Sequence, residues 1–265
     1  HLPKPAALYL VCCVCFTGCE TATAAAAICV ADVNWHSAGI LASMTQQTLE
    51  AQNMPVKRSA RFDSSASAAN AVREGRVDIV PECWSNCSEG LVTIPLGIQG
   101  KEGFYVPNYL LDQEPSLSDW TRSGTAEMLR GLGAVLLGPP RSWAPAFSSS
   151  TALAAALGLN MTVPQSEADY MALILDSLKW RAPIAFYQWR PHMITSNYPV
   201  QEVTLPDPVA PADHQQKLRK AYFEATDLVQ AWSPHLVYPV KSLAADILQV
   251  QLRTWDLSQT RMDRP

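Results

Sequence analysis

The chain has 265 residues, 48% of them hydrophobic and 17% charged, which suits one large or two small domains with an ordinary globular core. Its formal net charge is −4 and its Lys and Arg are not clustered, so nucleic acid is not expected as a partner, because phosphate binding depends on concentrated basic residues. No internal stretch reaches the roughly 20 apolar residues needed to span a bilayer.

Residues 1–27 differ from the rest of the chain. A lysine and an apolar run over residues 6–16 are followed by small residues over 21–27, a pattern typical of a secretory signal. We therefore expect export, to the periplasm or to the cell surface as a lipoprotein. Two processing routes stay open, because Cys19 ends a lipobox-like stretch while the alanine run after it offers a site for ordinary cleavage.

Strand and helix patterns alternate after the signal. Residues 28–33 predict a strand, Ser37 is expected to cap a helix, residues 64–73 predict a second helix, and residues 77–80 predict another strand. The order strand, helix, helix, strand is typical of an α/β layer with parallel pairing.

The pattern restarts after residue 130. Residues 134–137 predict a strand and 147–157 a helix; a capping box at Ser166 opens a further helix, and residues 183–187 predict the next strand.

Two similar α/β units on either side of residues 103–107 indicate two lobes with a hinge, and ligands commonly bind where lobes meet. Helical patterns over residues 213–231 and 241–255 are expected to pack back on the first lobe.

The cysteines of the mature chain leave two possibilities open. Cys83 and Cys87 are four residues apart, so a local disulfide is possible in an oxidising compartment. A zinc site would need four ligands, and the five histidines show no metal-ligand spacing near these thiols, so we expect no metal. Cys29, inside an apolar run, is most simply a small buried hydrophobe.

Three tryptophans stand shortly after predicted strands. Trp35, Trp84 and Trp189 each occupy a position where a buried strand would open into a cleft. Such a set suggests an aromatic cage, although a tryptophan in a chain of this size is often a core residue instead.

Four segments resemble, in order and spacing, the substrate-binding proteins of glycine betaine, proline betaine and choline ABC importers, and the similarity runs over residues 28–207. The segments are ADVNW (31–35), GRVDIVPECW (75–84), GFYVPNY (103–109), and SEA (166–168) with WRPH (189–192). The resemblance implies an α/β, two-lobed periplasmic-binding-protein fold of type II with the ligand cleft between the lobes. Lobe I would comprise residues 28–104 and 200–265, and lobe II residues 105–199.

The same resemblance implies a solute-binding protein that captures a quaternary ammonium osmolyte and delivers it to an ABC permease in the membrane. We expect a monomer without cofactor, catalytic residue or bound metal. By resemblance Trp35, Trp84 and Trp189 line the cage, Tyr105 forms a fourth wall, and Trp143 falls where some relatives carry a cage tryptophan, although a neighbouring glycine of their turn is missing here. A quaternary ammonium has no N–H donor, so ring faces hold it by cation–π attraction.

The ligand's other end involves three further candidates. His192 could bind a carboxylate or simply cap its loop. Choline-type relatives place an acidic residue shortly after the first cage tryptophan, whereas this chain has His36 and Ser37 there, which favours a carboxylated betaine. N–H groups at the start of that helix could receive the carboxylate. We therefore expect a glycine betaine-like ligand, with choline as the alternative.

Two other classes of protein remain possible. An enzyme of choline or betaine metabolism would need a cofactor motif or a catalytic base, and neither a Gly-rich nucleotide loop nor a nucleophile-elbow pattern is present, so an enzyme is not expected. A sensory ligand-binding module would share the same pocket and differ only in its partner.

Overall fold

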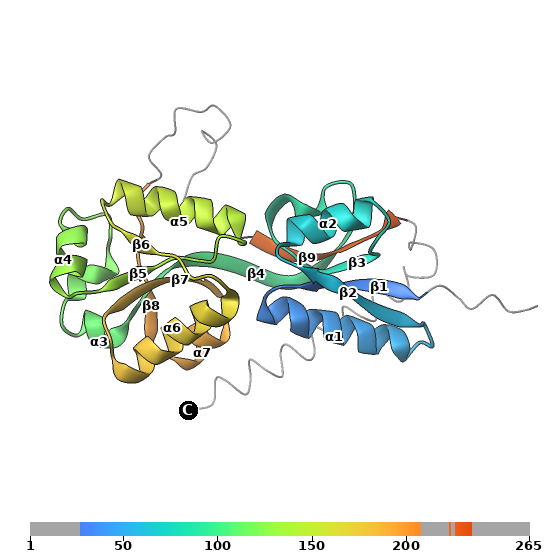
Figure 1. Ribbon diagram of the computed structural model, residues 1–265, viewed down its shortest axis with the longest axis horizontal. Coiled ribbons are helices and arrows are strands. Elements are labelled where there is room, and N and C mark those ends of the chain that lie inside the picture. Colours follow the sequence, from blue (N-terminus) through green and yellow to red (C-terminus); the bar gives the residue numbers. More distant parts are fainter. Residues whose placement is uncertain (1–26, 208–222, 224–225, 235–265) are drawn as a thin grey trace, which may run out of the picture.

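Strands and helices alternate along the computed structural model, which describes residues 27–207, residue 223 and residues 226–234 (Figure 1). The strands are β1 (Ile28–Val33), β2 (Val56–Phe62), β3 (Ile79–Cys83), β4 (Val92–Pro107), β5 (Val135–Leu137), β6 (Met161–Thr162), β7 (Ile184–Arg190), β8 (Val200–Glu202) and β9 (Thr226–Trp232). The α-helices are α1 (His36–Glu50), α2 (Ser65–Arg73), α3 (Asn108–Leu111), α4 (Thr125–Gly131), α5 (Ala144–Ala156), α6 (Glu167–Trp180) and α7 (Met193–Asn197). Two 3₁₀ turns, η1 (Ser85–Ser88) and η2 (Pro115–Ser118), complete the described elements.

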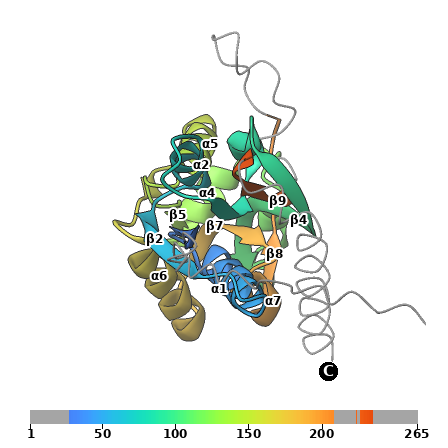
Figure 2. The same ribbon diagram turned by 90° about the vertical axis from the view of Figure 1, so that its right-hand side faces the viewer.

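The strands form one mixed sheet in the order β2-β1-β3-β9-β4-β7-β5-β6, with β8 paired to β4. In the first lobe β1 pairs in parallel with β2 and β3, while β9 lies antiparallel between β3 and β4. In the second lobe β7 pairs in parallel with β5 and antiparallel with β4. Helices cover both faces, with α2 and α5 on one side of the sheet and α1 and α6 on the other (Figures 1 and 2).

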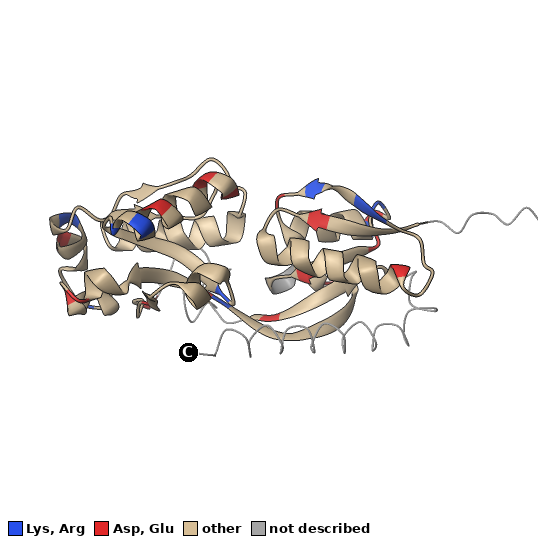
Figure 3. Cartoon of the chain, turned by 90° about the horizontal axis from the view of Figure 1, so that it is seen from below, with Lys and Arg blue, Asp and Glu red and all other residues tan. Residues whose placement is uncertain are grey.

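Strand β4 belongs to both lobes. Its first part pairs with β9 as far as Gly100, which lies opposite Thr226, and its second part pairs with β7 from Lys101, which lies opposite Arg190. Seen from below, β4 passes from one lobe to the other, and the Lys and Arg positions of the described residues are spread along the chain (Figure 3). We expected the hinge at residues 103–107. These residues are not at the crossover, because they lie within the part of β4 that pairs with β7 and β8.

The described residues after position 199 are divided between the two lobes. Residues 200–265 were assigned to the first lobe, but β8 pairs with β4 beside β7, in the second lobe. Strand β9 does lie in the first lobe, between β3 and β4. The chain therefore contributes to the second lobe beyond residue 199, because Val200 to Glu202 complete the sheet there.

Two predicted helix starts are confirmed by their capping contacts. The Ser64 hydroxyl accepts a hydrogen bond from the Ser67 backbone N–H at 3.1 Å, and the Ser166 hydroxyl accepts one from Asp169 at 3.1 Å. Each satisfies a backbone donor that has no partner within the helix, a contact worth about 1 kcal/mol.

Five of the described strands, namely β2, β4, β6, β8 and β9, were not predicted from the sequence. Strand β2 carries mostly half-buried or exposed side chains and so lacks an apolar pattern. The helix predicted over residues 213–231 is wrong at its end, because β9 begins at Thr226. Over a segment as short as β9, the buried side chains of Leu228, Ala231 and Trp232 do not distinguish the helical from the strand period. Pairing with the distant strands β3 and β4 selects the extended form. The signal segment, residues 213–222 and the helix predicted over residues 241–255 lie outside the described residues.

The two cysteines after β3 form a disulfide. Cys83 and Cys87 are bonded, with their Cα atoms 5.8 Å apart, within the range that such a bond requires. Among the described residues no three His, Cys, Asp or Glu side chains gather closely enough to hold a metal ion. Cys29 is buried and carries a free thiol, as expected for a small apolar residue.

No helix in the described part of the chain combines the length and the apolar character needed to cross a bilayer.

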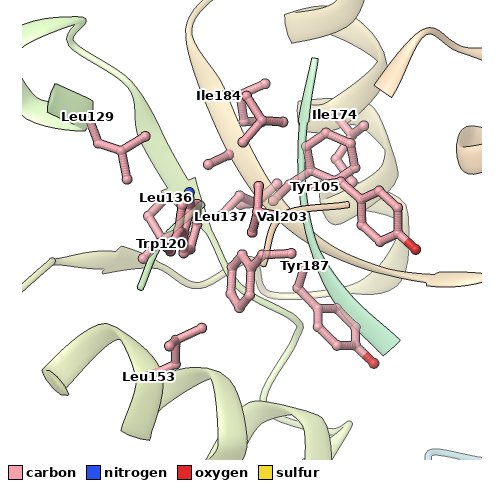
Figure 4. Close-up of a cluster of buried hydrophobic side chains, with 14 of the residues drawn as sticks. Tyr105, Trp120, Leu129, Leu136, Leu137, Leu153, Ile174, Ile184, Tyr187 and Val203 are labelled. Carbon is pink, nitrogen blue, oxygen red and sulfur yellow. The ribbon is translucent and has the colours of Figure 1, made fainter. Parts of the chain in front are cut away.

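Aromatic side chains dominate the core of the second lobe. Figure 4 shows part of this cluster, in which Tyr105 and Tyr187 turn their hydroxyl groups away from the other side chains. Phe104, Trp120 and Phe186 are almost completely buried, and the Phe104 and Trp120 ring centroids lie 5.5 Å apart. This packing holds β4 against β7, the strand pair that carries the site described below.

Truncating Phe186 should destabilise this core. Phe186→Ala removes a fully buried ring that lies against Tyr105, so we expect the free energy of unfolding to fall by about 3–5 kcal/mol. Urea unfolding followed by circular dichroism measures the change. Leu173→Ala, at a side chain that is 44% exposed on α6, is the control and should change stability by less than about 0.5 kcal/mol. Equal losses in the two variants would contradict this view of the core.

Candidate functional site

A cavity of about 590 Å³ lies between the two lobes. Its aromatic lining comes from both sides: Trp35 follows β1 and Trp84 follows β3 in the first lobe, whereas Trp143 precedes α5 in the second. Strand β7 contributes Tyr187 and Trp189, which lie on the same face of the strand because side chains alternate with a period of two. Five rings from four separate segments therefore surround one space.

The rings of the second lobe form a connected wall. Trp143 and Trp189 meet edge to face, with centroids 5.2 Å apart at an interplanar angle of 77°, and Tyr187 lies 6.3 Å from Trp189. The indole nitrogens of Trp35, Trp143 and Trp189 are buried, so these indoles offer ring carbon to the cavity. Electron-rich carbon surfaces of this kind attract organic cations.

A buried carboxylate lies behind the first-lobe rings. Glu82 is only 1% exposed, and its Oε1 accepts a hydrogen bond from the Trp84 indole N–H at 2.5 Å. Burial raises the pKa of Glu82, while the nearby Trp84, Ser37 and Trp35 side chains lower it, although Ser37 and Trp35 do not reach hydrogen-bond geometry with it. Glu82 therefore fixes the orientation of Trp84 and lies close to Trp35.

A glycine makes room for the Trp84 ring. A Cβ atom at Gly100 would overlap the Cη2 atom of Trp84, coming closer than two non-bonded carbon atoms can approach. Gly100 lies on β4 where the strand passes between the lobes. The indole therefore packs directly on the backbone of the crossover strand.

Tyr105, expected as the fourth wall of the cage, does not line this cavity. It lies opposite Phe186 across the β4–β7 pair, whereas Phe104 lies opposite Tyr187. Because neighbouring residues of a strand point to opposite faces, Tyr105 and Tyr187 are on different sides of the sheet. Burial, followed by the Glu202 carboxylate, raises the pKa of Tyr105 above its usual value.

The aromatic cavity is not lined by His36, Ser37 or His192. His36 and His192 line a second hollow of about 820 Å³ between α1 and α6, which shares only Trp35 with the aromatic cavity. His192 caps α7, accepting the Ile194 backbone N–H at Nδ1, and burial followed by the nearby His36 lowers its pKa to about 4, so it is neutral at pH 7. Ser37 faces Glu82 and lines neither hollow.

The structure thus brings four of the predicted residues to one cavity, namely Trp35, Trp84, Trp143 and Trp189. Sequence reasoning did not assign Tyr187, Glu82 or Glu102 to the site. Tyr187 stands two residues before Trp189 in a predicted strand, and that spacing places both on one face, a signal that could have found it. Glu82 stands two residues before its partner Trp84, a similar local signal, whereas Glu102 carries none because its partner Tyr187 is distant in the sequence.

Comparison with known proteins identifies relatives of the whole fold. Residues 26–233 match the family described as the substrate binding domain of the ABC-type glycine betaine transport system. No curated protein sequence matches the chain.

Solved structures agree in fold. Lactococcal OpuAC in its closed, liganded form with glycine betaine is 16% identical with a TM-score of 0.59, covering 86% of this chain and 89% of that one. An ABC-transporter choline binding protein in complex with choline is 14% identical with a TM-score of 0.58, and the match covers 80% of this chain and 73% of that one. The glycine betaine/L-proline-binding protein ProX from Borrelia burgdorferi is 16% identical with a TM-score of 0.55, and the match covers 79% of this chain and 76% of that one. The predicted two-lobed periplasmic-binding-protein fold is confirmed.

The close approach of Trp84 and Gly100 can be tested without a ligand. Gly100→Ala should force the indole away from β4, so we expect an altered near-ultraviolet circular dichroism spectrum with an unchanged far-ultraviolet spectrum. Gly39→Ala is the matched control, because a Cβ there meets nothing within 4 Å. If both variants keep the original near-ultraviolet spectrum, Trp84 does not pack on Gly100.

Burial of the Glu82 carboxyl predicts a pH-dependent stability. Its pKa is raised in the folded state, so the carboxylate costs stability above that pKa, and the cost disappears below the unfolded value of 4.5, where both states are protonated. Glu82→Gln keeps an oxygen acceptor for Trp84 and removes the charge. We expect it to raise the free energy of unfolding at pH 7, with the gain shrinking as the pH falls to 4. Urea unfolding at several pH values measures this, and a pH-independent difference would contradict it.

Proposed function

The chain belongs to the family of substrate-binding domains of ABC-type glycine betaine transport systems, and on that premise we propose that it captures a quaternary ammonium solute in the aromatic cavity and delivers it to a membrane permease. The observation that supports this most is the gathering of Trp35, Trp84, Trp143 and Trp189 around one space between the lobes. These residues come from separate segments, so their convergence is a property of the fold.

The chemistry of the cavity suits such a ligand. A quaternary ammonium cannot donate hydrogen bonds, and each ring face that contacts it contributes about 0.5–2 kcal/mol. Three or four such contacts supply most of the roughly 8 kcal/mol that a micromolar dissociation constant requires. In the proposed cage, Tyr187 takes the place that we expected for Tyr105.

Capture follows from the two-lobed architecture. First-lobe and second-lobe rings face each other across the cavity, and β4 is the described strand that joins the two sides. Rotation of the lobes about β4 brings the rings together around the cation, and the permease recognises the closed form. The chain acts as an exported monomer, either periplasmic or anchored at the surface through a lipidated Cys19, and performs no catalysis.

Two ligands remain candidates. The sequence favours a glycine betaine-like solute, since His36 and Ser37 replace the acidic residue of choline-type relatives, and the structure of lactococcal OpuAC contains glycine betaine. Choline, the ligand of another structural relative, is favoured by a different observation: Glu102 lines the cavity. A sensory module would use the same cavity with a different partner.

Removing one ring should weaken binding. Trp189→Ala deletes a wall of the cage, and the loss of its cation–π contact and of the packing with Trp143 should weaken binding by roughly tenfold or more. Calorimetric titration of the purified domain with glycine betaine, proline betaine and choline measures the change, and tryptophan fluorescence provides a second readout.

Trp180→Ala is the matched control for that experiment. Trp180 ends α6 and is 73% exposed, so its loss removes a tryptophan without touching the cavity. Unaltered binding in Trp189→Ala, or no saturable response of the original chain to any of the three solutes, would overturn the proposed function.

A further inference from the structure

We propose that Glu102, held by the hydroxyl of Tyr187, makes the cavity selective for quaternary ammonium ions with a net positive charge over zwitterionic betaines. This inference rests on the proposed function and narrows its ligand class. Glu102 is half-buried on β4 and lines the cavity together with Trp84, Trp143 and Trp189.

The register of the sheet places this carboxylate. Glu102 lies directly opposite Trp189 across the β4–β7 pair, so the two side chains share the face that meets the cavity. Phe104, two residues further along β4, lies opposite Tyr187 on that same face. A negative charge therefore stands beside the second-lobe wall of rings.

Tyr187 fixes the position of this charge. Its hydroxyl donates a hydrogen bond to Oε1 of Glu102. Burial, and then the Glu102 charge, raise the pKa of Tyr187 well above its usual value, so the phenol keeps its proton and remains a donor. The carboxylate is thereby oriented before any ligand arrives.

The charge balance of the cavity also favours a cation. Among the described residues, Asp63, Glu89 and Glu102 line it together with one guanidinium, that of Arg73. Arg73 already donates to the backbone oxygens of Cys87 and Glu89 and to the side chain of Asn70. Four of its five N–H donors thus bond to groups of the first lobe.

Two basic side chains on β4 and β7, those of Lys101 and Arg190, point away from the cavity. Lys101 and Arg190 both form ion pairs with Glu202, at 2.6 and 2.9 Å. They neighbour Glu102 and Trp189 in sequence, so the alternation of the strands places them on the opposite face of the sheet. Neither is directed toward a ligand carboxylate in the aromatic cavity.

The two groups expected to bind a ligand carboxylate, His192 and the backbone N–H groups at the start of α1, have partners within the protein. His192 lines the other hollow and uses its Nδ1 to cap α7, with its ring centroid 4.6 Å from that of Trp189. At the start of α1, the backbone N–H of His36 faces the protein's own Glu167 carboxylate, whose pKa is raised by burial and lowered by that N–H and by Arg61. Within the part of the chain that the structure describes, a betaine carboxylate would therefore meet the Glu102 carboxylate and no lysine or arginine directed toward it.

Binding of a matched set of solutes tests this selectivity. Choline and tetramethylammonium carry a net positive charge, whereas glycine betaine carries the same trimethylammonium group with a carboxylate. By calorimetric titration at low ionic strength we expect both cations to bind the original chain roughly tenfold or more tighter than glycine betaine, because like charges a few ångströms apart repel strongly in a partly buried site.

Glu102→Gln should remove this preference. It keeps the side-chain shape and an oxygen for the Tyr187 hydroxyl but removes the charge, so the cations should bind more weakly and the ratio of cation to betaine affinity should fall toward one. Glu127→Gln, at a 69% exposed carboxylate on α4, is the control for a general change of net charge and should keep the original ratio.

The outcomes separate the two proposals. If glycine betaine binds as tightly as choline or tighter, or if the affinity ratio is the same in Glu102→Gln and the original chain, the selectivity by Glu102 is wrong while the proposed function stands. If none of the three solutes binds, the proposed function itself fails.

Discussion

The pairing of β4 with both halves of the sheet is the constraint on which the site depends. One continuous strand hydrogen-bonds to β9 in the first lobe and to β7 in the second, with the change of partner between Gly100 and Lys101. Gly100 lets the Trp84 ring pack against this strand, and Glu102 follows two residues later on the wall of the cavity. The strand that joins the lobes thus also shapes the space between them.

The polar groups around the cavity determine how its rings are presented. Glu82 holds the Trp84 indole from behind, and Tyr187 both contributes a ring and orients Glu102. Cation–π attraction depends on the ring face being turned toward the cation, and a ring anchored through its N–H loses less conformational freedom when a ligand binds. The buried carboxylate costs stability, but it places an aromatic surface in a fixed direction.

Much of the fold was predictable from local patterns. The strand over residues 28–33 and the helix caps at Ser64 and Ser166 follow from short-range periodicity and side-chain-to-backbone hydrogen bonds, which the sequence displays directly. Strand β9 was not predictable in this way, since its extended form depends on β3 and β4, more than 100 residues away. Strand β2 was missed because its exposed side chains show no apolar alternation.

Some cavity residues were likewise predictable from the sequence, and others depend on contacts between distant strands. Four tryptophans were identified from their positions near strand ends and from family resemblance, and they do lie around one cavity. Choosing Tyr187 over Tyr105 requires knowing which face of β4 and β7 meets the cavity, and a single sequence does not state the register between two strands. Glu102 is likewise assigned to the cavity only once the register between β4 and β7 is known.

The central position of β9 also bears on how the chain assembles during its synthesis. The described strands of the second lobe come from one continuous stretch of sequence, ending with β8 at Glu202, so they can pair as soon as that stretch has emerged. The first lobe must wait for Trp232, because β9 fills the gap between β3 and β4. Until then β3 and the first part of β4 present open edges, and a chain that ended before Thr226 would lack the strand that covers them.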